Sequence, residues 1–145
     1  MALKRINPGK RMSAAVIHDG KAYLAGFTPD KMIGATVAEQ TREILQQIDA
    51  TLKQAGTDKT NIIKANIWLT NIATFAEMNS VWDTWVVAGS TPARATVEAK
   101  LAAPGIDVEI MVEAAIFKKP AKAKVAARPV KKAVKKTAKK KAGKK

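Results

Sequence analysis

The sequence has no cysteine and a single histidine, His18, among its 145 residues. Without cysteine the chain has no disulfide, zinc–thiolate site or thiol nucleophile. With one histidine it cannot form a metal site that needs several histidine ligands. No apolar run approaches the ~18 residues that a membrane-spanning helix needs. Residues 1–7 lack the apolar core of a signal peptide. We therefore expect a cytoplasmic protein with no membrane span.

Acidic residues are missing from one part of the chain. Residues 118–145 hold 14 of the 26 Lys and Arg and none of the 12 Asp and Glu, so this segment carries the whole formal net charge of +14. Residues 1–117 are formally neutral and contain all seven aromatic residues. The composition predicts one domain over 1–117, long enough to bury a core, followed by a polycationic tail over 118–145.

Turn signals and alternating apolar residues predict the strands. Asp19-Gly20 lies between the strand-like runs 13–18 and 21–27 and predicts a two-residue hairpin, because Gly accepts the positive φ of such turns. Three later runs also read as strands: 61–70, 93–99 and 107–117.

Two helices are predicted from capping signals. The spacing Thr-x-x-Glu at Thr36 is typical of a capping box and predicts a helix over 36–55 that ends before Gly56. The same spacing at Thr74 predicts a second helix over 74–87. Its apolar stripe is Met78, Val81, Trp82 and Trp85.

The resulting order, ββαβαββ, is typical of an α+β fold in which two helices cover one face of a single sheet. The opposite face would expose Trp68, Met111 and Phe117. Because an exposed apolar patch usually marks an interface, we infer a homo-oligomer whose sheets pack on one another.

Two segments of the domain resemble a known family. The run Thr-Pro-Ala-Arg-Ala-Thr-Val-Glu-Ala-Lys-Leu over 91–101, with Val-Glu-Ile from Val108 and Glu-Ala from Glu113, resembles the signature region of the Rid family of enamine/imine deaminases. The run Phe-x-x-Met-Asn-x-x-Trp-x-x-Trp from Phe75 is similar to the family's second helix. The resemblance covers about residues 10–117 and excludes the tail.

The resemblance implies a chorismate-mutase-like fold and a homotrimer whose sheets form a central barrel, with clefts between neighbouring subunits. It also implies hydrolysis of reactive 2-imino acids to 2-keto acids and ammonia, with no metal or organic cofactor. Such imines arise when pyridoxal-phosphate enzymes eliminate water from serine or threonine.

Four residues of the domain match site positions of the family. A guanidinium binds a carboxylate through two parallel hydrogen bonds, and the resemblance gives this role to Arg94; an ion pair with Glu98 is the alternative. Glu113 matches a carboxylate associated with the site water, and a structural role is its alternative. Asn79 matches a residue that helps shape the cleft, and ordinary hydrogen bonding of the helix is the slightly favoured alternative. Thr96 stands where relatives often have cysteine; a pocket-lining hydroxyl and strand propensity explain it equally well.

Two positions depart from the family pattern. Many active members have a tyrosine where this chain has Met12, and a hydroxyl residue where it has Ala25, just before Gly26. The site therefore keeps its carboxylate anchor and loses two hydroxyl contacts. A changed substrate range, or a site that binds without turnover, is the consequence to be tested.

The tail predicts a second activity. Its Lys, Ala and Pro composition is similar to the tails of linker histones and bacterial histone-like proteins, and it has almost nothing to bury, so we expect it to be disordered when free. It should bind DNA or RNA without sequence specificity, through counterion release, and so hold the protein at the nucleoid. A solubilising extension is the alternative. The cations assigned to this contact are Lys131, Lys132, Lys135, Lys136, Lys139, Lys140 and Lys141.

Three functions follow from these patterns. The first is an imine deaminase with a polyanion-binding tail. The second is a non-catalytic nucleic-acid-associated trimer that serves as a scaffold for tails. The third is a trimer that binds a small ligand without turnover.

Overall fold

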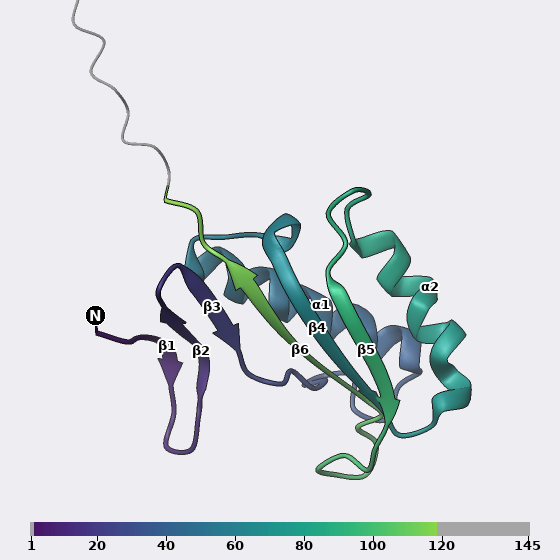
Figure 1. Cartoon of the computed structure of the whole chain (residues 1–145). Coiled ribbons are helices and arrows are strands. Elements are labelled where there is room, and N and C mark those ends of the chain that lie inside the picture. The colour runs from purple at the N-terminus through teal and green to yellow at the C-terminus, as the bar shows by residue number, and fades with distance from the viewer. Residues whose placement is uncertain (1, 119–145) are drawn as a thin grey trace, which may run out of the picture.

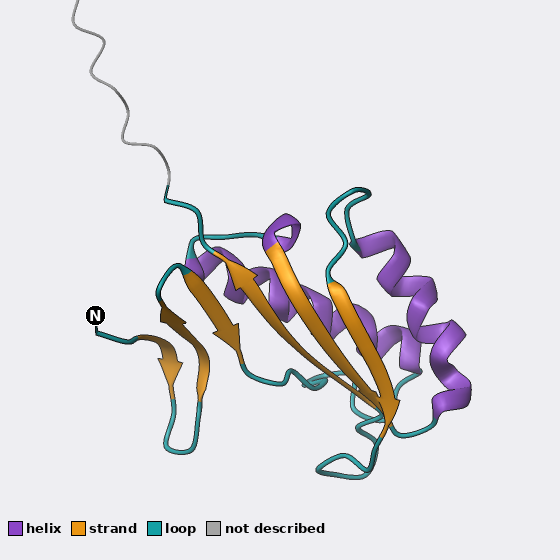
Figure 2. Ribbon diagram, viewed as in Figure 1, coloured by secondary structure: helices purple, strands orange, loops and turns teal. Residues whose placement is uncertain are grey.

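The computed structural model describes residues 2–118, which form one sheet with both helices on the same side of it (Figure 1). The predicted α+β arrangement is confirmed, and Figure 2 shows the helical and sheet layers separately coloured. The tail prediction, with its seven assigned lysines, lies outside the described residues from position 119 onward. The elements are β1 (Lys4–Pro8), β2 (Ser13–His18), β3 (Lys21–Leu24), α1 (Val37–Ala55), β4 (Ile62–Leu69), α2 (Phe75–Trp85), β5 (Ala93–Glu98) and β6 (Val108–Ala115).

The sheet has six strands in the order β1-β2-β3-β6-β4-β5. The pair β4–β5 is parallel and the other pairs are antiparallel. β6, the last strand of the chain, therefore lies between β3 and β4, and it joins the N-terminal hairpin to the strands that follow α1. β5 is left as an edge strand beside α2 (Figure 1).

The local signals for α1 are confirmed. The Thr36 hydroxyl accepts from the Glu39 backbone N–H while the Glu39 carboxylate accepts from the Thr36 N–H, so both halves of the capping box are present. Gly56, with φ of 83°, ends the helix in the left-handed region, which Gly adopts without steric cost. The apolar face packs Ile44, Ile48 and Leu52 into the core.

The capping box predicted for α2 is wrong. A 3-10 turn over Ile72–Thr74 leads into the helix, so Thr74 has a ψ of 9° and not the extended backbone of a capping residue. Its hydroxyl donates to the Asn71 carbonyl instead. Glu77, the intended partner, accepts from the Ala38 N–H at the start of α1 and thereby ties the two helices together.

The strand β1 was not predicted. It contains Pro8 and two charged residues, which hide its strand character, and only Ile6 of it is buried. Pro is tolerated at a sheet edge because it removes a donor that faces solvent. The hairpin between β2 and β3 is as predicted: Asp19 and Gly20 both have positive φ, of 47° and 71°.

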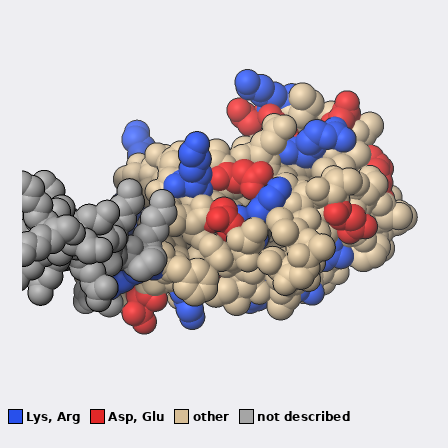
Figure 3. All heavy atoms as spheres, turned by 90° about the horizontal axis from the view of Figure 1, so that it is seen from above, with Lys and Arg blue, Asp and Glu red and all other residues tan. Residues whose placement is uncertain are grey.

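The two faces of the sheet differ sharply. The face under the helices is the core, built from alternate residues of β3, β4 and β6. The outer face carries half-buried Trp68 and exposed Tyr23, Val97 and Met111, and Phe117 beyond β6 is 70% exposed. Charges of both signs are interspersed on the surface that Figure 3 presents. No helix within residues 2–118 is long and apolar enough to span a membrane.

Candidate functional site

Arg94 is brought to Asn79 by the packing of α2 on β5. In the register of the sheet Arg94 pairs with Ala65 of β4, which also pairs with Val112 of β6. Ala65 and Val112 are buried under the helices, so Arg94 projects to the same face, where it is half-buried. Its Nη1 donates to the Asn79 Oδ1 at 2.8 Å. Two of the residues predicted for the site therefore meet.

Glu98 is not the partner of Arg94. It lies on the same face of β5, but its carboxylate accepts from the Ile72 backbone N–H at 3.0 Å. Within residues 2–118 the guanidinium donates one hydrogen bond, and the acceptor is a neutral amide oxygen. A guanidinium has five N–H donors, so most of them remain available to an incoming anion.

Thr96 follows Arg94 on the same face of β5. Its side-chain oxygen is buried and has no hydrogen-bond partner among residues 2–118. A buried hydroxyl without a partner is unusual in a folded protein and calls for an explanation. A ligand that reaches Arg94 from the edge of the sheet would supply one.

Glu113 lies on the opposite face of the sheet from Arg94. It pairs with Tyr23 of β3 and with Lys64 of β4 on the outer face, where it borders a small hollow of about 70 Å³ with Asn66 and Met111. Since side chains alternate along a strand, the sheet separates Glu113 from Arg94 in one copy of the chain.

A second carboxylate, Glu109, approaches Gly26, the residue that follows Ala25. It lies on the same face as Glu113, and a Cβ placed on Gly26 would overlap its Oε1. Gly26, Ala25 and Met12 line a hollow of about 510 Å³ that Gln47 of α1 closes on one side. Glu109 was not among the site residues predicted from the sequence. The available signal was Gly26 itself, because an isolated Gly at the end of a strand often marks a close approach.

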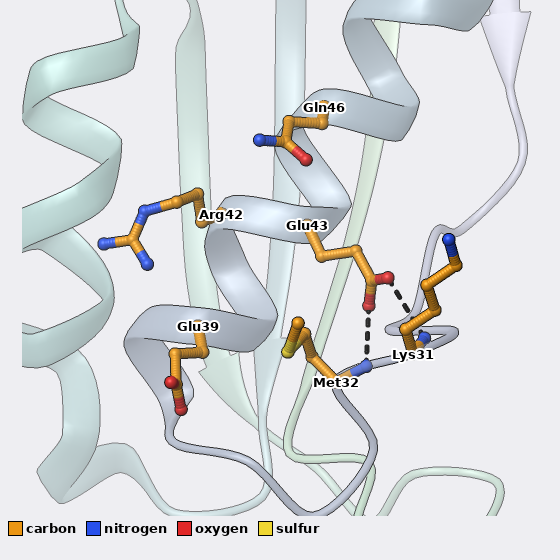
Figure 4. Close-up of a pocket in the computed structure, with 6 residues that line it drawn as sticks. All are labelled: Lys31, Met32, Glu39, Arg42, Glu43 and Gln46. Atoms are coloured by element: carbon orange, nitrogen blue, oxygen red, sulfur yellow. Dashed lines mark hydrogen bonds between the residues drawn. The ribbon is translucent and has the colours of Figure 1, made fainter.

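The segment after Gly26 is held by a carboxylate on α1. Glu43 accepts the backbone N–H groups of Asp30, Lys31 and Met32 at 2.9–3.0 Å, and Figure 4 shows its oxygens pointing at this loop. Burial raises the pKa of Glu43, but the three N–H groups outweigh it and the net pKa lies below the ordinary value. The neighbouring Gln47 donates to the Thr28 carbonyl at 3.1 Å. Two turns of α1 thus fix one wall of the larger hollow.

The described residues contain no group of three or more His, Cys, Asp or Glu side chains placed to hold a metal ion. What they offer is a half-buried guanidinium with free donors on one side of the sheet and two carboxylates on the other. The guanidinium suits recognition of a small carboxylate, and either carboxylate suits proton transfer, but one copy of the chain keeps the two functions on opposite faces of the sheet.

Comparisons with known proteins identify close similarities. A family model described as "Endoribonuclease L-PSP" matches residues 2–116. A "RutC family protein" from Haemophilus influenzae is 45% identical over 112 residues, which cover 77% of this chain and 97% of that protein. A rat protein named "2-iminobutanoate/2-iminopropanoate deaminase" is 30% identical over 103 residues, covering 68% of this chain and 74% of its own length.

Solved structures share the fold. A YjgF-family protein from Neisseria meningitidis, 43% identical, superposes with a TM-score of 0.79 over 82% of this chain and 98% of its own. A Rid-family protein from Yersinia pestis, 32% identical, gives a TM-score of 0.71 over 79% of this chain and all of its own. The β1 strand that the sequence analysis missed falls within the segment that the family model matches.

Proposed function

The chain belongs to the Endoribonuclease L-PSP family, the Rid family of the sequence resemblance, and we propose that it hydrolyses reactive 2-imino acids to 2-keto acids and ammonia. The similarity to the rat deaminase supports this reaction class. The single observation that carries the proposal is the state of Arg94, whose free donors are those that a 2-imino carboxylate needs.

In this proposal the substrate carboxylate binds Arg94 through two hydrogen bonds, and Asn79 fixes the guanidinium from the other side. Thr96 donates its hydroxyl proton to the bound ligand and so acquires the partner that it lacks. Water adds to the carbon of the C=N bond. A carboxylate takes one proton from the water oxygen and passes it to nitrogen, which gives a carbinolamine. The same carboxylate then takes the proton of the new hydroxyl and passes it to nitrogen, so the C–N bond breaks, ammonia leaves and the C=O bond forms.

The proposal needs a second copy of the chain, because the sheet separates Arg94 from Glu109 and Glu113. β5 is an edge strand, so another subunit can approach Arg94 from that edge and present its own outer face. The exposed apolar residues of that face, Val97 and Met111 among them, suit burial in such an interface. We therefore propose a homotrimer with its sites between subunits, as the family resemblance implies.

Glu113 stays the predicted carboxylate, and Glu109 is the second candidate because of its contact with Gly26. The two are separated by the variants Glu113→Gln and Glu109→Gln, each of which keeps the shape of the side chain and removes the base. Replacement of the carboxylate that acts as the base should lower kcat by about 100-fold or more. The other variant should keep a kcat within about threefold of wild type.

The deaminase itself is tested with imines made in the cuvette. A serine or threonine dehydratase supplies the 2-imino acid, semicarbazide traps what remains, and the loss of trapped product reports hydrolysis. Wild type should accelerate imine loss, and Arg94→Ala should lower kcat/KM by about 10- to 100-fold, the effect of losing a charge-assisted pair. Arg42→Ala, which removes an exposed arginine on α1, is the matched control. Binding of a 2-keto acid without any acceleration would favour the small-ligand alternative.

We also propose that the tail binds polyanions. The observation in favour is compositional: 14 Lys and Arg and no acid over 118–145, attached to a formally neutral domain. Each phosphate neutralised should contribute a slope of about −0.9 to the dependence of log affinity on log salt for duplex DNA. In a trimer three tails act together and raise avidity.

Gel shifts with duplex DNA and with RNA test the tail, with full-length protein compared with residues 1–117 at two salt concentrations. Retention should require the tail and weaken at the higher salt. Equal retention by both proteins would contradict the role. Because the family description mentions RNA cleavage, the integrity of the RNA is followed in the same lanes. A tail that binds, on a domain that does not turn over imines, would favour the scaffold alternative.

A further inference from the structure

The guanidinium of Arg94 contacts three side chains on one face of α2. Phe75, Asn79 and Trp82 are spaced four and three residues apart and so share that face. The Arg94 Cζ lies 5.1 Å from the centroid of the Trp82 ring and 5.6 Å from that of the Phe75 ring. Between these two contacts α2 supplies the amide oxygen of Asn79, at 2.8 Å from Nη1.

Aromatic rings stabilise a guanidinium without using its hydrogen-bond donors. All five N–H groups lie in the guanidinium plane, whereas a cation–π contact is made through the electron-rich face of a ring. A protein carboxylate at the same place would occupy two of the donors and neutralise the charge. Two rings and one neutral amide therefore orient the Arg94 guanidinium, with its remaining donors ready for a ligand.

The two rings differ in what else they do. Trp82 is 5% exposed and belongs to the hydrophobic core, so its replacement would disturb packing. Phe75 is 41% exposed and begins α2. The Phe75 ring thus contributes less to the core than the Trp82 ring does. Core packing therefore does not explain why Phe75 contacts Arg94.

We propose that Phe75 is a positioning residue for Arg94, whose ring orients the guanidinium for a ligand carboxylate through a cation–π contact. The inference rests on the proposed function for the identity of the ligand, a 2-imino or 2-keto acid. It adds to that function the element that keeps the anchor in place. A contact of this kind at a partly exposed position should change carboxylate affinity by about 2- to 5-fold.

The test is a graded series at position 75 in the full-length protein. Phe75→Tyr keeps the electron-rich ring, replacement by 4-cyanophenylalanine keeps the ring but withdraws its electron density, and Phe75→Leu removes it. The probe is 2-ketobutanoate, a stable 2-keto acid, with its Kd measured calorimetrically. Ile72→Ala, which trims an exposed apolar side chain just before α2, is the matched control.

We expect Kd to follow ring electron density: wild type and Phe75→Tyr tightest, the cyano variant weaker, and Phe75→Leu weakest by about 2- to 5-fold. With imine substrates KM should rise in the same order while kcat stays within about twofold, because the ring acts through binding. In Phe75→Leu the Arg94 Nε–H resonance should lose the Phe75 part of its ring-current shift and keep the part due to Trp82. Each variant should have the same unfolding midpoint as Ile72→Ala within error. A variant that disturbed the core would unfold at a lower temperature.

A cyano variant equal to wild type, or a Phe75→Tyr variant as weak as Phe75→Leu, would overturn the inference, as would a wild type that does not bind 2-ketobutanoate. Failure of the proposed function looks different: 2-ketobutanoate binds with the graded series intact, but imines are not hydrolysed. Hydrolysis that depends on Arg94 and ignores position 75 would leave the function standing and reject the role of Phe75.

Discussion

At the scale of single residues, the buried hydroxyl of Thr96 has opposite consequences for the stability of the free protein and for ligand binding. The oxygen has no partner in the described residues, and a buried polar group without a partner destabilises a protein by about 1–3 kcal/mol. Thr96→Val removes the hydroxyl with little change in shape. It should therefore raise the free energy of unfolding and weaken 2-keto acid binding.

Chemical denaturation and calorimetry measure both effects on the same samples, with Thr96→Ser as the variant that keeps the hydroxyl. A Thr96→Val protein that is less stable than wild type would mean that the hydroxyl is satisfied. Unchanged ligand affinity would remove Thr96 from the site.

The residues also show what the sequence can and cannot predict about a site. The family pattern predicted Arg94 and Asn79 as site residues, and the structure joins their side chains by a 2.8 Å hydrogen bond. Strict alternation along β6 already implies that Glu109 and Glu113 share a face. That Arg94 lies on the other face depends on how β5 pairs with β4, which is set by long-range packing and has no local signal.

At the scale of elements, the Glu43 carboxylate fixes the loop over residues 30–32 to α1 (Figure 4). Its pKa is below the ordinary value of 4.5 in the folded protein. A lowered carboxylate pKa contributes stability that is present above the unfolded value and is lost as pH falls through the folded value. The loop contact should therefore be intact near neutrality and fail in acid.

Glu43→Gln should lower the unfolding midpoint near pH 7, and its difference from wild type should shrink as pH falls below 4.5. Thermal unfolding across a pH series measures this. Asp83→Asn on the exposed side of α2 is the control for removing one carboxylate. A difference that is constant with pH would show that the carboxylate charge does not hold the loop.

The two helix starts give a matched pair of variants. Thr36 caps α1 through a complete capping box, whereas Thr74 makes no side-chain capping bond. Thr36→Ala should destabilise the protein by about 1 kcal/mol, and Thr74→Ala by less than half of that. Urea denaturation separates them, and equal losses would contradict the assignment of the caps.

Those same helix starts explain why local patterns predict some elements better than others. Thr-x-x-Glu occurs at both positions, but the chain enters α1 in extended conformation and α2 through a 3-10 turn. The turn places Thr74 outside the geometry that a cap requires. β1 was missed for a related reason, since an edge strand with Pro8 needs no alternating apolar pattern.

At the scale of the whole molecule, the proposed homotrimer would bury the outer face of the sheet, where Val97 and Met111 are exposed. We expect a solution mass of three times 15.6 kDa by sedimentation equilibrium. Met111→Lys places a charge in the centre of that face and should shift the mass towards the monomer. Ile72→Lys, on the helical side, should leave the mass unchanged. A wild-type monomer, or a Met111→Lys trimer, would contradict packing through this face.

The number of subunits could not be predicted from the residues alone. Exposed Met111 and half-buried Trp68 favour a covered face, but burial energy is non-directional and does not choose between two, three or more copies. The boundary between the neutral residues 1–117 and the basic residues 118–145 could be predicted in full, because net charge follows from composition alone.

The most direct test of the account is a crystal structure of the protein with 2-ketobutanoate bound. The ligand should lie between two subunits, with its carboxylate within hydrogen-bond distance of the Arg94 guanidinium of one subunit. Glu109 or Glu113 of the other subunit should face the keto carbon. A ligand bound away from Arg94, or a cleft that contains neither carboxylate, would contradict it.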